Sequence, residues 1–289
     1  MNDPNDPTIV VTEFMPEKIS VKAGTKVSWS WSGTEPHSVT FNPDRKAPPP
    51  GPPDDALFAP APGDVNASGT LVNSGLVPLG PGPAPAFSQT FSTPGSYQYF
   101  CVIHPGMIGT VDVSASASDT PADVAARAKK EGDAWLAEGQ AAKNKLKDAA
   151  PRSERAPDGS STWSVEMGST TEHTDILAFA PIPVTVKSGD TVTFVNNSGA
   201  PHTATFAGAQ QLPRDPTGPD ANNPKPGPSP QTLNKTDLFN SGVLPPNAPP
   251  GAVPEPVRSF SFKVPAVGQY PFVCILHVSS NMIGTVAAT

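Results

Sequence analysis

The chain of 289 residues carries one pattern of residues twice, and this repeat limits how it can fold. Equivalent residues are separated by 165 positions near the start of each repeat, by 173 at the cysteines and by 175 at the final methionines. The pairs that show this are Phe14 and Phe179, Gly24 and Gly189, His37 and His202, Cys101 and Cys274, and Met107 and Met282. These matches show that the chain is a duplication. Each repeat is about as long as one domain, so two similar domains are expected.

The pattern within each repeat predicts β-strands. Val27 to Trp31 alternates apolar and polar residues, and Val184 to Val186 does so before a turn at 187–190. Residues 97–101 lead to the first cysteine, and residues 109–113 lead away from the same region as a last strand. The segments 47–53 and 223–230 are rich in proline, which cannot donate to a strand ladder, and are expected to be surface loops.

Residues 114–161 have a different character. Thr120, Pro121 and Asp123 have the order of a helix start, and apolar residues then recur at helical spacing until a proline at 151. The sequence therefore predicts a first domain at 1–113, a helical linker at 114–161 and a second domain at 162–289. We expect Gly132 and Gly139 to weaken this helix, and Trp135 to anchor it on one of the domains.

Each repeat supplies one cysteine, two histidines and one methionine in the same order. The first set is His37, Cys101, His104 and Met107, and the second is His202, Cys274, His277 and Met282. One thiolate, two imidazoles and a weak axial thioether are the ligands of a blue-copper electron-transfer site. The thiolate and thioether favour Cu(I), while imidazoles suit both oxidation states. The sequence therefore predicts two copper ions per chain.

These motifs resemble those of the cupredoxins, the family of plastocyanin, pseudoazurin, amicyanin and halocyanin. The resemblance covers roughly residues 8–113 and 162–289. The first loop, Cys-x-x-His-x-x-Met, has the spacing of amicyanin, and the second, with four residues between His and Met, has that of plastocyanin and pseudoazurin. The resemblance implies an all-β protein of two Greek-key β-sandwiches joined by the helical linker, with a type 1 copper site in each sandwich.

Two features depart from the plastocyanin pattern. Ser38 and Thr203 follow the first histidine of each repeat, where plastocyanin-like proteins usually have an asparagine that supports the cysteine loop. We expect a hydroxyl group to make that contact here. The loops between histidine and cysteine are also longer than in single-domain plastocyanins. These departures bear on the redox potentials and leave the ligand sets unchanged.

The ligand count argues against an enzyme. Copper nitrite reductases and small laccases, which also contain cupredoxin domains, place a histidine beside the type 1 cysteine. Apolar residues stand there in this chain, namely Phe100, Val102, Val273 and Ile275. Of the five histidines only His173 is left over, and we expect it to be a solvated surface residue. The cysteines occupy equivalent positions in separate repeats, so they are expected to be free thiols.

The function that these residues predict is electron transfer by two type 1 copper sites, without enzymatic activity. A copper store or delivery protein is one alternative, and an accessory domain pair of a copper redox enzyme is another. Stores tend to use many exposed methionines or cysteines, whereas this chain has five methionines and two cysteines.

The expected partners are redox proteins that dock on apolar residues around His104 and His277. Those residues are Ile103, Pro105, Gly106 and Ile108 in the first repeat, and Leu276, Val278 and Ile283 in the second. Small apolar contacts suit a carrier that must release its partner quickly.

Charge and hydropathy exclude other partners. The net charge is −7 and no basic run stands beside aromatic residues, so nucleic acid is not expected. No apolar stretch approaches the roughly 18 residues of a membrane span. The first residues lack the basic and apolar regions of a leader. From the chemistry of the copper sites we expect a periplasmic or extracellular protein in a mature form, from which a leader has been removed.

Overall fold

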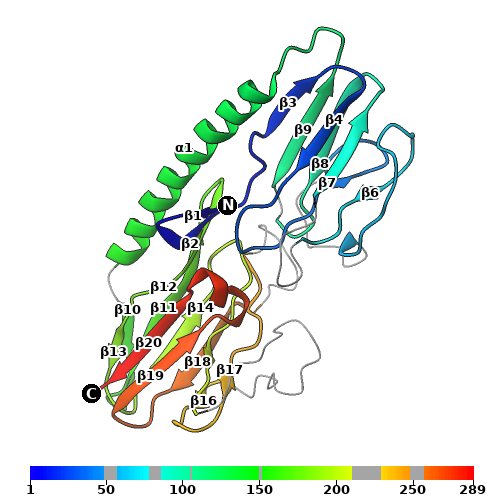
Figure 1. The fold of residues 1–289 in the computed structure, drawn as a ribbon. Coiled ribbons are helices and arrows are strands. Elements are labelled where there is room, and N and C mark those ends of the chain that lie inside the picture. The colour runs from blue at the N-terminus through cyan, green and yellow to red at the C-terminus, as the bar shows by residue number, and fades with distance from the viewer. Residues whose placement is uncertain (49–56, 78–85, 105, 150–151, 210–228, 248–256) are drawn as a thin grey trace. The chain divides into compact units, whose positions relative to one another are not determined.

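A computed structural model describes residues 1–48, 57–77, 86–104, 106–149, 152–209, 229–247 and 257–289. These residues form two compact units, one of residues 1–2 and 10–137 and the other of residues 3–9 and 138–289. Strands dominate both units, and one long helix lies between the two repeats in the sequence (Figure 1). The predicted all-β class with a helical linker is therefore confirmed.

The first unit contains two sheets. Their strands are β3 (Lys18–Val21), β4 (Thr25–Trp29), β5 (Thr40–Phe41), β6 (Val72–Asn73), β7 (Phe87–Phe91), β8 (Gly95–Phe100) and β9 (Ile108–Val113). One sheet has the order β3-β9-β8-β5-β6, and the other pairs β4 with β7. Strand β9 follows the cysteine loop and lies between β3 and β8 in this sheet. It runs parallel to β3 and antiparallel to β8.

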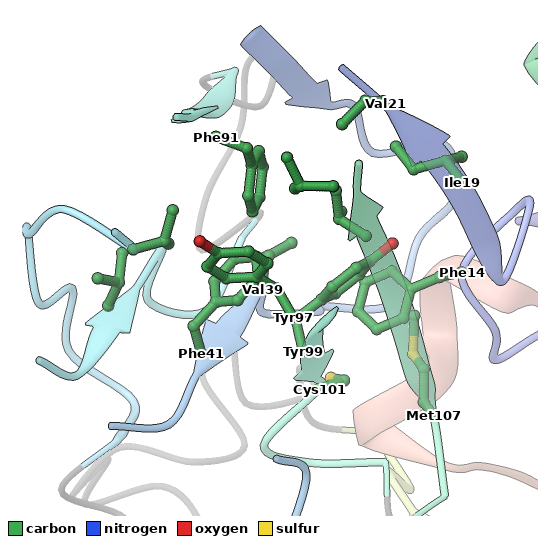
Figure 2. Close-up of a cluster of buried hydrophobic side chains, with 14 residues drawn as sticks. Phe14, Ile19, Val21, Val39, Phe41, Phe91, Tyr97, Tyr99, Cys101 and Met107 are labelled. Carbon is green, nitrogen blue, oxygen red and sulfur yellow. The ribbon is translucent and has the colours of Figure 1, made fainter. Parts of the chain in front are cut away.

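Aromatic side chains fill the space between these sheets. The ring of Tyr99 lies 4.6 Å from Phe14, 5.2 Å from Trp29 and 5.3 Å from Phe41, measured between ring centroids. Figure 2 shows Cys101 and Met107 at one end of this cluster, below Tyr99 and Phe14 in that view. The core thus ends at the sulfur atoms of the predicted site, which keeps them away from water.

The second unit contains a larger pair of sheets. Its strands are β10 (Arg152–Arg155), β11 (Ser161–Thr170), β12 (Thr174–Ala180), β13 (Val184–Val186), β14 (Thr191–Val195), β15 (Thr205–Phe206), β16 (Gln231–Thr232), β17 (Phe239–Asn240), β18 (Ser259–Lys263), β19 (Gly268–Val273) and β20 (Ile283–Ala288). One sheet has the order β13-β20-β19-β15-β17, which repeats the five-stranded sheet of the first unit.

The other sheet of the second unit takes in the start of the chain. Its order is β1-β2-β12-β11-β14-β18-β16, where β1 is Asn2–Asp3 and β2 is Asp6–Val11, and β10 pairs with β11. Strand β14 pairs with β11 on one side and with β18 on the other. Its counterpart β4 pairs with β7 alone among the described strands, so the two repeats differ at this edge.

Helix α1 (Pro121–Asp148) begins and ends as the sequence predicts. The Thr120 hydroxyl accepts a hydrogen bond from the Asp123 amide, and the Asp123 carboxylate accepts one from the Thr120 amide, which is a reciprocal N-terminal cap. Trp135 is buried, as expected of an anchor.

The two helix glycines have a role that the sequence analysis did not predict. A Cβ on Gly132 would stand 3.0 Å from the Met15 sulfur, and one on Gly139 would stand 2.6 Å from an Ile9 methyl group. Both residues are buried. They allow the helix backbone to lie close to Met15 and to strand β2, and this packing offsets the helix propensity that a glycine loses.

The structure corrects one expectation about His173. This residue is half-buried, and its Nδ1 atom lies 2.9 Å from the Glu138 carboxylate on α1. The helix therefore holds a residue that the polar sequence around it had suggested to be free in solvent.

Candidate metal centres

Three ligand side chains of the first repeat meet at one point. The Cys101 sulfur lies 3.3 Å from Nδ1 of His104 and 3.9 Å from Nδ1 of His37. His37 lies between β4 and β5, Cys101 directly follows β8, and His104 lies in the loop before β9. The sandwich thus brings together residues that are far apart in the sequence.

The second repeat forms the same cluster. The Cys274 sulfur lies 3.3 Å from Nδ1 of His277 and 3.8 Å from Nδ1 of His202, and the two Nδ1 atoms are 3.1 Å apart. Within each of the two clusters the ligand atoms all lie within 4.8 Å of one another. Both cysteines are free thiols, which confirms that they do not form a disulfide.

Backbone hydrogen bonds hold each methionine beside its cluster. The Cys101 amide donates to the Met107 carbonyl, and the Met107 amide donates to the His104 carbonyl. The second loop makes the equivalent bonds between Cys274, Met282 and His277. The two additional residues of that loop are taken up by a short 3-10 helix, η2 (Ile275–Ser280). The loops thus differ in length but present the methionine in the same way.

A backbone amide and a hydroxyl support each cysteine. The Ser38 amide donates to the Cys101 sulfur at 3.4 Å, and the Ser38 hydroxyl accepts from the Val102 amide. In the second repeat the Thr203 amide donates to the Cys274 sulfur at 3.3 Å, and its hydroxyl accepts from the Ile275 amide. The expectation that a hydroxyl group replaces the usual asparagine contact is confirmed.

These hydroxyls belong to a longer chain of hydrogen bonds. The Asn73 amide group donates to two carbonyls, so its oxygen must accept the hydrogen of Thr40, and the Thr40 oxygen then accepts from Ser38. Thr203, Thr205 and Asn240 make the same chain in the second repeat. Thr40 and Asn73 of the first repeat thus correspond to Thr205 and Asn240 of the second in sequence and in contacts.

The electrostatics of the clusters favour metal ligation. Burial would raise the pKa of the Cys101 thiol, but the His104 imidazole and the Ser38 amide together bring that pKa below its usual value. The pKa of Cys274 is lowered in the same way, by His277 and the Thr203 amide against the effect of burial. A lowered thiol pKa favours the thiolate, which is the form that binds metals.

The first histidine of each cluster is held neutral. Burial and the neighbouring imidazole lower the pKa of His37 and that of His202 well below the usual value for histidine. A neutral imidazole has a free lone pair for a metal, so both residues are ready to act as ligands at neutral pH.

The two clusters differ in their exposure to solvent. His37 and His104 are half-buried, whereas His202 is fully buried and His277 is 5% exposed. The His202 ring also packs against Gly168 of β11, where a Cβ would stand 2.8 Å from its Nε2 atom. Gly168 has φ of +84°, so only the absence of a side chain allows the strand to lie this close.

Part of the predicted apolar surface is present around the second cluster. Val278 is 45% exposed and Ile283 is 51% exposed, while Leu276 is half-buried. Around the first cluster Ile103 and Ile108 are half-buried and Gly106 is exposed, and Pro105 lies outside the described residues. Among the described residues, the second cluster therefore has the more exposed apolar side chains beside its last histidine.

The donor atoms fit a copper ion. Each cluster offers one sulfur of lowered thiol pKa and two imidazole Nδ1 atoms that face the same point, with a buried methionine in the adjoining loop. Two nitrogens, one thiolate and a weak axial thioether are the donors that select blue copper among the transition metals.

Comparison with known proteins agrees with this chemistry. The model of the copper-binding proteins of the plastocyanin/azurin family matches residues 8–114 and again residues 165–289. Plastocyanin of Scenedesmus fuscus is 30% identical over 110 residues, which are 38% of this chain and 85% of the relative. Chloroplastic plastocyanin of Chlamydomonas reinhardtii is 28% identical over 110 residues, again 38% of this chain, and the chain spans 57% of the length of that relative.

Solved structures show smaller likenesses. A mutant plastocyanin of fern covers 44% of this chain and 99% of its own, with 24% identity and a TM-score of 0.27. A purple cupredoxin from Nitrosopumilus maritimus covers 44% of this chain and 98% of its own, with 14% identity and a TM-score of 0.24. Since the family model covers both repeats and well over half of the residues, this chain belongs to the copper-binding plastocyanin/azurin family, with two family domains in tandem.

Proposed function

We propose that the chain is an electron carrier with two type 1 copper sites, one in each repeat. The observation that carries this proposal is the pair of clusters, in which a cysteine sulfur and two Nδ1 atoms converge within 4.8 Å. The ligands in this proposal are His37, Cys101, His104 and Met107 for one copper, and His202, Cys274, His277 and Met282 for the other. The domain bounds in this proposal are those expected from the sequence, 1–113 and 162–289, with residues 114–161 between them.

The residues around each cluster limit how far the ligands can move. A bound copper ion would take up and release one electron by cycling between Cu(II) and Cu(I). The Ser38 and Thr203 amides donate to the cysteine sulfurs, and the hydroxyl chains behind them tie both flanks of the site to buried asparagines. Ligands held in this way need little rearrangement when the charge of the site changes, and fixed surroundings of this kind favour rapid electron transfer.

Electrons enter and leave through the last histidine of each set in this proposal. Val278 and Ile283 form an exposed apolar surface beside His277, on which a redox partner protein can dock and from which it can leave. Among the residues that the structure describes, no helix combines the length and apolar character needed to cross a bilayer. A periplasmic or extracellular location, expected from the copper chemistry of the two sites, is part of the proposal.

Two other functions are weaker candidates. An enzyme would need a further copper centre, and His173, the histidine outside the two sets, is bound to Glu138 on the helix. A store or delivery protein would need ligands that open easily, whereas Cys274 and Met282 are fully buried.

The first test is a copper titration of the metal-free protein followed by visible absorption. We expect saturation at two equivalents, with an intense band from thiolate-to-copper charge transfer. Binding of many equivalents without this band would instead favour a store. Steady-state consumption of nitrite or oxygen at a rate that follows protein-bound copper would contradict a carrier.

The two copper sites are expected to differ in reduction potential. With one thiolate and neutral histidines, the oxidised site carries one positive charge and the reduced site carries none, so burial favours the reduced form. The second cluster is the more buried one, and the amide-to-sulfur distances are nearly equal, 3.4 and 3.3 Å. We therefore expect the second site to have the more positive midpoint.

Redox titration of two variants measures this difference. Cys101→Ser keeps the second site, and Cys274→Ser keeps the first. Equal midpoints, or a more positive midpoint for the first site, would show that burial does not set the order.

A further inference from the structure

A buried network behind His202 has no role in the function proposed so far. The Nε2 atom of His202, on the side of the ring away from the cluster, lies 2.9 Å from the Ser198 hydroxyl. That hydroxyl lies 2.8 Å from the Asn196 side-chain oxygen and 3.1 Å from the Ala200 carbonyl. Asn196, Ser198 and His202 are all at most 1% exposed. Buried polar groups that bond only with one another fix each other's orientation.

The partners of Asn196 decide the direction of these hydrogen bonds. Its Nδ2 atom is surrounded by three backbone carbonyls, those of Ala200, Leu244 and Pro245, which can only accept. The nitrogen must therefore occupy that position, and the Asn196 oxygen faces Ser198 as an acceptor. The Ser198 amide donates to the same oxygen, which confirms this orientation.

The serine hydroxyl then determines the state of the histidine. The Ser198 hydroxyl has one hydrogen, and it donates that hydrogen to the Asn196 oxygen or the Ala200 carbonyl, neither of which can donate in return. Only its lone pairs remain for His202. The hydrogen between the two residues must come from the ring, so Nε2 carries the proton and Nδ1, which faces Cys274, carries the free lone pair.

The first repeat lacks this device. At the same separation of 165 residues, Trp31 stands in place of Asn196 and Gly33 in place of Ser198. Gly33 is exposed and offers no hydroxyl to His37, and a Cβ there would stand 2.8 Å from the Asn2 side-chain oxygen. The Trp31 indole donates to the His37 carbonyl, which holds the backbone of that residue but not its ring.

We propose that Ser198 is a positioning residue that locks His202 as its Nε2–H tautomer and presents Nδ1 to the metal, and that this hydroxyl has no counterpart at the equivalent position of the first repeat. The role in metal binding rests on the proposed function, but the tautomer is a property of the metal-free protein. Groups that orient a metal-binding histidine commonly change metal affinity by about tenfold to a hundredfold. The lock therefore makes the second site the one that retains copper longer.

The first part of the test uses metal-free protein in the Cys101→Ser background. Nitrogen-15 NMR of labelled histidine, at a mildly alkaline pH, reports which ring nitrogen of His202 carries the proton. We expect the Nε2–H form alone in the parent and in Ser198→Thr, which keeps the hydroxyl. Ser198→Ala should give a mixture of tautomers. Ser261→Ala is the control, because it removes a hydroxyl that bonds to Thr193 in the same unit and does not touch His202.

The second part follows copper release from the same four proteins to a chelator. We expect release from Ser198→Ala to be about tenfold faster or more, with Ser198→Thr and Ser261→Ala near the parent. A mixture of tautomers in the parent, or an unchanged tautomer and release rate in Ser198→Ala, would overturn the proposal. The tautomer in the parent is measured with Ser198 in place, so the proposal can be overturned even if the Ser198→Ala protein fails to fold. If no variant binds copper while the tautomer result holds, it is the proposed function that has failed.

Discussion

Replacing Cys101 with serine is expected to remove about half of the visible absorption of the copper-loaded protein, and Cys274→Ser should remove the other half. The band arises from charge transfer between a thiolate and copper, and a serine hydroxyl cannot supply it. Each cysteine lies 3.3 Å from the histidine of its own loop, so each site should keep its band when the other is lost. Absorption and copper content, measured on the same samples, check the result.

The double variant, Cys101→Ser with Cys274→Ser, is the reference for complete loss. Loss of the entire band in either single variant would mean that the two cysteines share one site. Unchanged absorption in one single variant would mean that the corresponding repeat does not hold type 1 copper.

The second large effect concerns stability. The Lys143 ammonium on α1 is 9% exposed and binds the Asp6 carboxylate and the Thr8 hydroxyl of β2. Asp6→Ala would leave this ammonium buried without its counter-charge, and removal of one partner of a buried ion pair costs roughly 3 kcal/mol. Because the Asp6 side chain is 22% exposed, we expect about 2 kcal/mol of destabilisation in the second unit. Hydrogen exchange of the β12 amides, together with urea unfolding, measures the loss.

Two further variants isolate the cause of this effect. Lys143→Met combined with Asp6→Ala removes both charges and is expected to recover most of the stability, since no buried charge is left unpaired. Lys129→Ala, on the same helix, breaks a pair with Asp133 in which both side chains are more than 60% exposed, and should change stability by less than about 0.5 kcal/mol. Equal losses for Asp6→Ala and Lys129→Ala would show that burial of the pair is unimportant.

Acid should act on the same contact. Burial would raise the pKa of Asp6, but the hydrogen bonds and charge of Lys143 and the Thr8 contacts bring that pKa below its ordinary value. The stabilisation is therefore present above the unfolded-state pKa of about 4, and is lost as the pH falls through the lower folded-state value. The difference between the parent and Asp6→Ala should shrink over that range.

Much of the site was predictable from the sequence because duplication made the chemistry visible. The ligand types recur in order, and the alternation at Val27 and the turn after Val186 predict strands that β4 and β13 confirm. The helix was predictable for a different reason: its cap and its end depend on neighbours in sequence, such as Thr120 and Asp123.

The parts that escaped prediction depend on contacts between distant residues. Nothing local in Asp6 or Lys143 indicates that they meet, and Gly139 is an ordinary helix-weakening residue until Ile9 lies against it. Ser198 gave no signal in the sequence, because the residues around it differ from those around Gly33, its counterpart in the first repeat. Its role became clear only when the three carbonyls around Asn196 determined the direction of the hydrogen bonds.

The placement of residues 3–9 in the second unit has a consequence for synthesis on the ribosome. These residues are synthesised long before the strand beside which β2 lies, since that strand, β12, begins at Thr174. At about 5 to 20 residues per second, the wait is on the order of ten to thirty seconds. During that time the apolar run Ile9-Val10-Val11 has no completed sheet to join and is a target for chaperones or for a neighbouring nascent chain. Slower translation would lengthen this exposure, so the rate of elongation, as well as stability, should influence the yield of soluble protein.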